Sequence, residues 1–257
     1  MDLSHGTAVI TGASGGIGEQ FAVRLAAGGV NLVLVARSTA KLEKLRAVLL
    51  ERHPELVIDV LTADLAAPET SATLVEQVSG LGRHVDILVN NAGIGSHGRF
   101  VEADPRQLAD QIQLNCGSLV DLTARWMPAM TRARHGVIIN VASTSAFQPV
   151  ATMAVYAATK AFVLSFTEAL WAETTGTGVR VLTLCPGATE TEFFARTGQQ
   201  FMTRGRQTPD QVVTTALDAL DRSTPTVVSG TRNSLLARGY RFIPRRVMAR
   251  FSGQMVR

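Results

Sequence analysis

Short runs of apolar, mostly β-branched residues recur along the chain, and longer segments with helical spacing separate them. Runs that are this short and this continuously apolar are typical of strands buried on both faces of a parallel sheet. Strands are predicted at Thr7–Thr11, Asn31–Ala36, Val57–Leu61, Val85–Val89, Val137–Val141, Val179–Leu184 and Thr226–Ser229.

The segments between these runs repeat their apolar residues at the spacing of a helix. Helices are predicted over Ile17–Ala27, Thr39–Arg52, 105–133 and 154–175. Alternating strands and helices are typical of an α/β fold, here a doubly wound and mainly parallel seven-stranded sheet with helices on both faces.

No linker, repeat or low-complexity tract divides the chain, so we predict one domain over residues 1–257. Two segments differ from the rest of it. Residues 188–208 contain scattered polar residues and glycines at 198 and 205, which predicts a mobile loop beside the substrate. Residues 232–257 form a basic C-terminal tail.

The composition is that of a globular protein, with 46% hydrophobic and 18% charged residues, which excludes a disordered chain. The two cysteines, Cys116 and Cys185, lie in apolar stretches and predict a reducing compartment rather than a disulfide framework. The first residues lack the pattern of a signal peptide, and no apolar run is long enough to span a membrane, so we expect a cytoplasmic protein. The five histidines lack metal-ligand spacing, and we predict no metal site.

Charge is unevenly distributed along the chain. The tail carries seven arginines and no acidic residue, whereas acidic residues outnumber basic ones elsewhere, so we expect no nucleic-acid binding. Val247, Met248, Phe251 and Met255 fall near one helical face, which Arg245, Arg246 and Arg250 flank. A basic amphipathic helix predicts contact of residues 241–257 with a membrane surface or an acidic partner. The other interpretation is an ordinary helix folded onto its own subunit or a neighbour.

A glycine-rich turn, Thr11–Gly18, lies between the first strand and the first helix. Gly12, Gly16 and Gly18 allow a sharp turn, a close approach to a pyrophosphate and tight packing of helix on strand. The N–H groups at the helix start then bind the phosphates. In this context the turn predicts a Rossmann-type dinucleotide site.

The turn after the second strand discriminates between NAD and NADP. An NAD site would place an acidic residue there to bind the ribose 2′-hydroxyl, but this chain has Arg37 and Ser38. An arginine pairs with a 2′-phosphate, so the sequence favours NADP(H) over NAD(H).

These and further motifs resemble the short-chain dehydrogenase/reductase family, in its compact branch of about 250 residues, over residues 5–230. The matching motifs are TGxxxGxG at Thr11–Gly18, an acidic residue at Asp64, NNAG at Asn90–Gly93, the helix asparagine Asn115, the serine Ser143, YxxxK at Tyr156–Lys160, and PGxxxT from Pro186 to Thr191. One departure is Gly15, where many NADP-preferring relatives carry a basic residue.

The resemblance implies a catalytic group and a cofactor site. The catalytic group is Asn115, Ser143, Tyr156 and Lys160. The cofactor-binding residues are Gly12, Ser14, Gly16, Ile17, Gly18, Arg37, Ser38, Asp64, Leu65, Asn91, Ala92, Gly93, Tyr156, Lys160, Pro186, Gly187, Thr189 and Thr191. Asp64 is expected at the adenine and Asn90 beside the adenosine, with Ala92 near the cofactor through its backbone. Thr189 and Thr191 are expected at the carboxamide.

The residue types fit proton transfer to a carbonyl. Tyr156 and Lys160 are four apart on a predicted helix and share a face. We expect the Lys160 ammonium to lower the pKa of Tyr156, which donates the proton as hydride arrives. Ser143 stabilises the same oxygen, and the resemblance implies that Asn115 anchors a water linked to Lys160.

The substrate site is predicted to be apolar and lined by Phe100, Phe147, Val150, Met153, Phe193 and Phe194. The sequence thus predicts an NADPH-dependent oxidoreductase that interconverts a carbonyl and a secondary alcohol on a lipophilic small molecule such as a steroid or 3-oxoacyl compound. The alternative is a non-catalytic NADP-binding regulatory protein. The resemblance to the family also implies a homodimer or homotetramer, with the helices in 105–133 and 154–175 at the interface.

Overall fold

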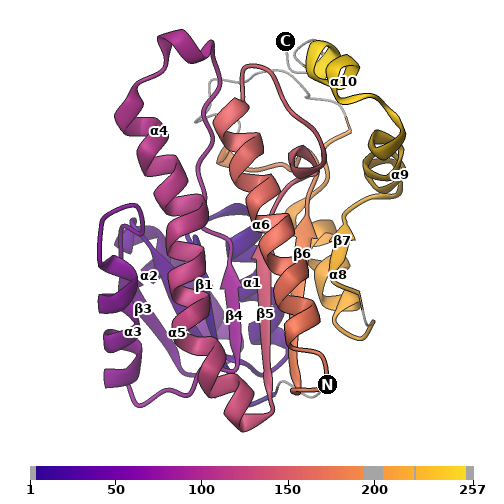
Figure 1. The fold of residues 1–257 in the computed structure, drawn as a ribbon. Helices are drawn as coiled ribbons and strands as arrows, with labels where there is room; N and C mark the ends of the chain where they lie inside the picture. Colours follow the sequence, from indigo (N-terminus) through magenta and orange to yellow (C-terminus); the bar gives the residue numbers. More distant parts are fainter. Residues whose placement is uncertain (1–3, 194–204, 223, 253–257) are drawn as a thin grey trace.

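The computed structural model describes residues 4–193, 205–222 and 224–252. Its centre is a seven-stranded parallel sheet with strand order β3-β2-β1-β4-β5-β6-β7 (Figure 1). The strands are β1 (Thr7–Thr11), β2 (Asn31–Ala36), β3 (Ile58–Thr62), β4 (Ile87–Asn90), β5 (Gly136–Val141), β6 (Val179–Cys185) and β7 (Thr226–Val228). The predicted doubly wound α/β fold and its seven strands are confirmed.

Alternate residues of each strand point to opposite faces of the sheet, and helices bury both faces. On one face, Ile10 and Leu34 pack against α1 (Gly16–Ala27), α2 (Thr39–Arg52) and α8 (Pro209–Ala219). On the other face, Val9 and Val33 pack against α3 (Thr70–Gly80), α5 (Ser118–Ala133) and α6 (Ala154–Glu173). The continuous apolar runs in the sequence follow from this burial on both sides.

The predicted helix over 105–133 is interrupted in the structure. It consists of α4 (Pro105–Ile112), a π-helical turn η2 (Gln113–Gly117), and α5. Helical periodicity does not reveal this interruption, because the turn depends on what the Asn115 side chain binds. Turns of this kind occur frequently at functional sites.

The chain order of the strands reverses at β1, whose neighbours are β2 and β4. Crossovers from the two neighbours leave in opposite directions there, so a crevice opens beyond the carboxyl ends of β1 and β4. The glycine-rich turn follows β1, the NNAG segment follows β4, and Ser143 follows β5. The fold therefore gathers the predicted motifs at one edge of the sheet.

The chain after β7 forms three short helices, α9 (Thr231–Gly239), η4 (Tyr240–Phe242) and α10 (Arg245–Ser252). Two earlier 3-10 helices are η1 (Phe100–Glu102) and η3 (Thr144–Phe147), and α9 packs against η3. In Figure 1, α9 and α10 stand at the periphery, and α10 lies at the same end of the molecule as α4. Within the described ranges, no helix is long and apolar enough to cross a membrane.

Candidate active site

The glycine-rich turn is packed too closely to hold larger side chains at three positions. Gly12 and Gly16 have left-handed backbone angles, φ 67° and 60°. A Cβ atom on Gly12 would lie 2.7 Å from the Asn91 amide nitrogen, and one on Gly16 would lie 2.7 Å from the Thr191 methyl group. A Cβ on Gly18 would run into the Gly12 carbonyl. The turn therefore brings bare backbone to the crevice, as a pyrophosphate requires.

Gly15 differs from the other three glycines. Its backbone is extended, and a Cβ atom there would have open space. Gly15 is the residue before α1, and it has no side chain that could accept hydrogen bonds from the first N–H groups of the helix. An anion at this helix start would complete these hydrogen bonds and interact favourably with the helix dipole. The residues present fit a cofactor phosphate.

Thr11 and Asn91 hold the turn against β4. The Thr11 hydroxyl accepts hydrogen bonds from the backbone N–H groups of Asn91 and Ala92, both at 3.0 Å, and donates to the Val89 carbonyl. The Asn91 amide donates to the Thr11 carbonyl at 2.9 Å and the Gly12 carbonyl at 3.3 Å. The Asn91 side chain therefore positions the turn. Sequence analysis missed the role of Thr11, although the first threonine of the TGxxxGxG motif marks it.

Arg37 and Ser38 stand exposed at the end of β2. The Arg37 guanidinium forms no ion pair or side-chain hydrogen bond within the described part of the chain. Asp64 is also exposed, and its carboxylate accepts a hydrogen bond from the Ala66 N–H at 3.1 Å, while Leu65 is buried. An unpaired arginine at this end of the crevice fits a 2′-phosphate better than a ribose hydroxyl.

The segment after β6 closes over the same crevice. Lys41, in the first turn of α2, forms an ion pair of 2.7 Å with Glu192. The ends of the predicted loop are joined by a bridge between Thr189 and Gln207. The Thr189 hydroxyl donates to the Gly187 carbonyl in its own loop rather than to the crevice. Residues 194–204 of the loop, including Phe194 and Gly198, lie outside the described residues.

Ser143 and Tyr156 form the centre of the candidate catalytic group. The Ser143 side chain begins η3, where its hydroxyl accepts a hydrogen bond from the Ser145 N–H at 3.1 Å. The Ser143 side chain lies near the Tyr156 hydroxyl, where it acts to lower the pKa of that group. Tyr156 is 8% exposed and comes from the first turn of α6. Two hydroxyl groups therefore converge on one point at the carboxyl edge of the sheet.

Lys160 lies one helical turn after Tyr156 and is buried. Its ammonium donates to the Val141 carbonyl at 2.8 Å and lies 5.9 Å from the centroid of the Tyr156 ring. Gly93 allows the NNAG segment to approach this group, since a Cβ there would lie 3.5 Å from the ammonium. The spacing of four residues predicted this shared helical face correctly.

The electrostatics of the pair differ from the sequence-based expectation. We expected the Lys160 ammonium to lower the pKa of Tyr156. Burial instead raises the pKa of Tyr156 to about 12, with the Ser143 side chain opposing that effect. Burial also lowers the pKa of Lys160 to about 8. The expectation was wrong because removal of the Tyr156 hydroxyl from water outweighs the effect that lowers its pKa.

Asn115 is buried in η2 and binds the segment that follows the NNAG motif. Its side-chain oxygen accepts from the Ile94 N–H at 3.0 Å, and its nitrogen donates to the Ile94 carbonyl at 2.9 Å and the Thr159 hydroxyl at 3.0 Å. These bonds link α4–α5 to α6 beside Lys160. The π-helical turn orients Asn115 toward both partners. The role of Thr159 as a partner of Asn115 was not predicted from the sequence, where the position of Thr159 directly before Lys160 is the one feature that indicates it.

Asn90 does not line the adenosine site. Its side chain is buried under the sheet, where its amide donates to Asn140 at 2.9 Å and Thr123 at 3.1 Å. Asn140 in turn donates to Thr167 at 2.9 Å. Successive side chains along a strand point to opposite faces of the sheet, so Asn90 faces the packed helices and not the crevice. The expectation that Asn90 lies beside the adenosine was therefore wrong.

Fewer apolar residues line the expected substrate site than the sequence predicted. Val150 and Met153 pack around Tyr156 together with Phe193, whose ring centroid lies 5.4 Å from that of Tyr156. Phe147 instead packs into the core between α5 and α6, and Phe100 is 67% exposed on η1. Three of the five predicted lining residues that the structure describes therefore surround Tyr156.

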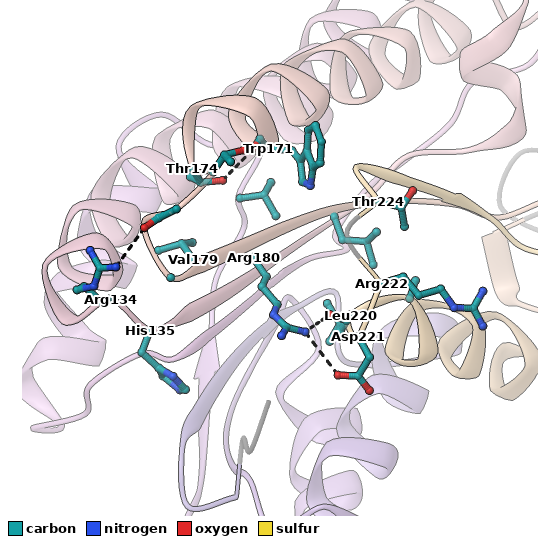
Figure 2. Close-up of a pocket in the computed structure, with 16 residues that line it drawn as sticks. Arg134, His135, Trp171, Thr174, Val179, Arg180, Leu220, Asp221, Arg222 and Thr224 are labelled. Carbon is teal, nitrogen blue, oxygen red and sulfur yellow. Dashed lines mark hydrogen bonds and ion pairs between the residues drawn. The ribbon is translucent and has the colours of Figure 1, made fainter.

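A cavity of about 660 Å³ lies at the opposite end of the sheet (Figure 2). It is surrounded by the carboxyl ends of α5, α6 and α8. Arg134 donates to the Gly176 carbonyl at 3.2 Å, and Arg180 donates to the Leu220 carbonyl. Helix carboxyl ends attract cations and repel anions. Arg134 and Arg180 thus satisfy backbone carbonyls and do not indicate an anion site.

Comparisons with known proteins agree with this geometry. The sequence pattern of the short chain dehydrogenase family matches residues 6–201. A very-long-chain 3-oxoacyl-CoA reductase of Phaeosphaeria nodorum is 37% identical over 68% of this chain and 52% of its own length, so the chain spans about half of that relative.

Two solved structures are similar over nearly their whole length. A short-chain dehydrogenase from Sphingobium yanoikuyae in complex with NADPH has a TM-score of 0.83 and 33% identity, covering 92% of this chain and 94% of its own. A bulky-bulky ketone specific alcohol dehydrogenase from Comamonas testosteroni has a TM-score of 0.79 and 30% identity, covering 94% of both chains.

Proposed function

Since this chain belongs to the short-chain dehydrogenase family of oxidoreductases, which act on alcohol and ketone groups, we propose that it uses NADPH to reduce a bulky lipophilic ketone. The reverse oxidation of the alcohol uses the same groups. The observation that carries this proposal is the convergence of Ser143, Tyr156, Lys160 and Asn115 at the carboxyl edge of the sheet.

In this proposal Tyr156 is the proton donor. Its raised pKa keeps the hydroxyl protonated at neutral pH, so it holds the proton that a reduced carbonyl oxygen needs. The Ser143 hydroxyl hydrogen-bonds that oxygen and stabilises its developing charge. The nicotinamide cofactor supplies the hydride.

In this proposal Lys160 and Asn115 do not transfer the proton themselves, but position the groups around Tyr156. The Lys160 ammonium is held by the Val141 carbonyl and presents its remaining protons to the cofactor ribose. Asn115 fixes Ile94 and Thr159, and so fixes the distance between the NNAG segment and α6. A regulatory NADP-binding protein would have no use for this buried set, which disfavours that alternative.

The choice of NADPH rests on Arg37. Its guanidinium is exposed and has no partner within the described residues, and Ser38 beside it offers a hydroxyl to the same phosphate. The remaining proposed cofactor contacts are the predicted residues of the glycine-rich turn, Asp64–Leu65, Asn91–Gly93 and the segment from Pro186 to Thr191. The NADPH complex of the Sphingobium relative supports this choice.

The proposed substrate is apolar because Val150, Met153 and Phe193 surround Tyr156. Two of the relatives, the very-long-chain 3-oxoacyl-CoA reductase and the bulky-bulky ketone specific alcohol dehydrogenase, are named for large substrates. We propose the same class here, with the loop of residues 188–208 contributing to the site.

The test is cofactor consumption by the purified protein with steroids, 3-oxoacyl thioesters and bulky aryl ketones, using NADPH and NADH in parallel. We expect turnover with NADPH, a fall of about 10-fold or more in NADPH affinity for Arg37→Ala, and little change with NADH. NADPH binding without turnover on any compound would instead support the regulatory alternative. Equal loss for both cofactors in Arg37→Ala would refute the 2′-phosphate contact.

We further propose a homo-oligomer formed through α4 and α6. An apolar groove lies between these helices and is lined by Ile112, Cys116, Val155 and Phe162, among others. Ile112 and Phe162 are 50% and 44% exposed. Large exposed apolar patches mark interfaces, and a second copy would cover them. Sedimentation of Phe162→Glu should give a smaller assembly than the wild type.

A further inference from the structure

The segment from Thr231 to Ser252 exposes its apolar side chains. Of the twelve large apolar residues that are exposed in the described part of the chain, five lie in this segment, although it makes up less than a tenth of the chain. Within the segment, Phe242 and Leu235 are the most exposed, at 88% and 73%, and the other three are Leu236, Ile243 and Val247. Isolated exposed apolar residues need no explanation, but a concentration of them marks a contact surface.

Arginines alternate with these apolar residues along the segment. Arg232, Arg238, Arg245, Arg246 and Arg250 are exposed, and none forms an ion pair with a described residue. The segment itself contains no Asp or Glu. By contrast, six arginines in the rest of the chain pair with carboxylates, among them Arg24 with Asp210. The segment therefore carries a positive charge that the protein does not neutralise.

The segment is attached next to the candidate catalytic group. α9 packs against η3, the helix that directly follows Ser143. The Asn233 amide donates to the Ser229 carbonyl at 2.8 Å, and a Cβ on Gly187 would collide with the Asn233 side chain. Met248 is the buried side chain of α10, at 6% exposed. A surface bound by this segment would lie beside the entrance to the site.

We propose that residues 231–252 dock on an anionic lipid surface. Arginines attract acidic headgroups, and exposed apolar side chains enter the boundary between headgroups and acyl chains. The apolar residues favour lipid over a soluble acidic protein, which would leave Phe242 and Leu235 without a matching environment. A second copy docked through this surface would bring two sets of unpaired arginines together, and their repulsion disfavours it.

This surface differs from the one that the sequence predicted. The sequence grouped Val247 and Met248 on one contacting face of a helix. The structure turns Met248 inward and leaves Val247 exposed, and it adds Leu235 and Phe242 from α9 and η4. Met255 and Arg257 lie outside the described residues, and the placement of the Phe251 side chain is not among those described.

The test is co-sedimentation of the full-length protein with vesicles of phosphatidylcholine, with and without phosphatidylserine. We expect binding only to the anionic vesicles, and release as the salt concentration rises. Removing one arginine near the surface weakens partitioning about 5-fold, so the triple variant Arg245→Gln/Arg246→Gln/Arg250→Gln should lose about 100-fold.

Matched controls separate the surface from general charge and folding effects. Arg52→Gln/Arg132→Gln removes exposed arginines from α2 and α5 and should sediment nearly as the wild type. Phe242→Ser should weaken binding, whereas Leu81→Ser, at a 39% exposed residue after α3, should not. Circular dichroism checks that each variant is folded.

Three outcomes would overturn the proposal: no binding to anionic vesicles, equal losses in the control variants, or binding to soluble polyglutamate but not to vesicles. The last would identify an acidic protein as the partner. Sedimentation does not depend on turnover, so this proposal and the proposed function fail or hold separately.

Discussion

The catalytic edge of the sheet and the segment 231–252 lie next to each other but are built in opposite ways. At the catalytic edge polar side chains are buried, and two of them have fixed partners: Asn115 binds Ile94, and Lys160 binds the Val141 carbonyl. In the segment, charged and apolar groups are exposed, and the arginines have no partner among the described residues. Fixed partners preorganise a site for chemistry, whereas groups without partners remain available to bind a surface.

The comparison implies that each region can lose its function without affecting the other. Substitutions at the catalytic edge should alter turnover or folding stability and leave vesicle binding unchanged. Substitutions in the segment should do the reverse. Each of the first three variant pairs below contains one member at or behind the catalytic edge and one matched residue elsewhere.

The largest effect is expected for Tyr156→Phe, which removes the proton donor. Turnover should fall about 1,000-fold, while NADPH binding measured by fluorescence is retained. The chain has one other tyrosine, Tyr240 in η4, and Tyr240→Phe should keep turnover within about 2-fold, a change below half a kcal/mol. Comparable losses in both variants would contradict the assignment of Tyr156 as the donor.

Asn115→Ala should destabilise the fold more than Asn233→Ala. Loss of the Asn115 side chain leaves both backbone groups of Ile94 and the Thr159 hydroxyl without this partner in a buried place. We expect about 3 kcal/mol of lost stability, against about 1 kcal/mol for the half-buried Asn233 in α9. Urea unfolding measures both. A loss below 1 kcal/mol for Asn115→Ala would show that its role is not structural.

Lys160→Met should abolish turnover without destabilising the protein. Burial lowers the pKa of Lys160 from 10.5 to about 8, so holding the ammonium in the fold costs about 3 kcal/mol at neutral pH, which removal of the charge recovers in part.

The pH dependence of stability provides a second measurement for this variant. Between pH 8 and 10 the unfolded wild type binds more protons at this lysine than the folded form, so its contribution to stability rises with pH. The free energy of unfolding of the wild type, measured relative to Lys160→Met, should therefore rise over this range, whereas measured relative to Lys41→Met, which removes an exposed lysine, it should not change with pH. A marked fall in the melting temperature of Lys160→Met would contradict the expectation.

The smallest effect on folding is expected for Met248→Ala. In the described side chains of α10, Met248 is the only buried one, so its loss should release α10 while the sheet stays intact. We expect a global loss of about 1 kcal/mol or less and faster hydrogen exchange in α10. Met130→Ala, at a fully buried methionine of α5, should cost about 3 kcal/mol. Equal costs would mean that α10 is part of the core.

Local patterns in the sequence determined the architecture and the chemistry of the site. The seven apolar runs became the seven strands because a strand buried on both faces must be apolar throughout. The glycine-rich turn, NNAG, Ser143 and the Tyr156–Lys160 pair lie at one edge because parallel strands end at the same side. Spacing of four residues also placed Tyr156 and Lys160 on one face of α6, as expected.

The tertiary structure decided what burial and distant contacts control. It interrupted the 105–133 helix at Asn115, because the asparagine binds Ile94, which is distant in sequence. It raised the pKa of Tyr156 instead of lowering it, and it turned Asn90 away from the crevice. It also turned Met248 inward while leaving Phe242 exposed. Periodicity records only which residues share a face of one element, whereas the removal of a group from water depends on which other elements pack against that face.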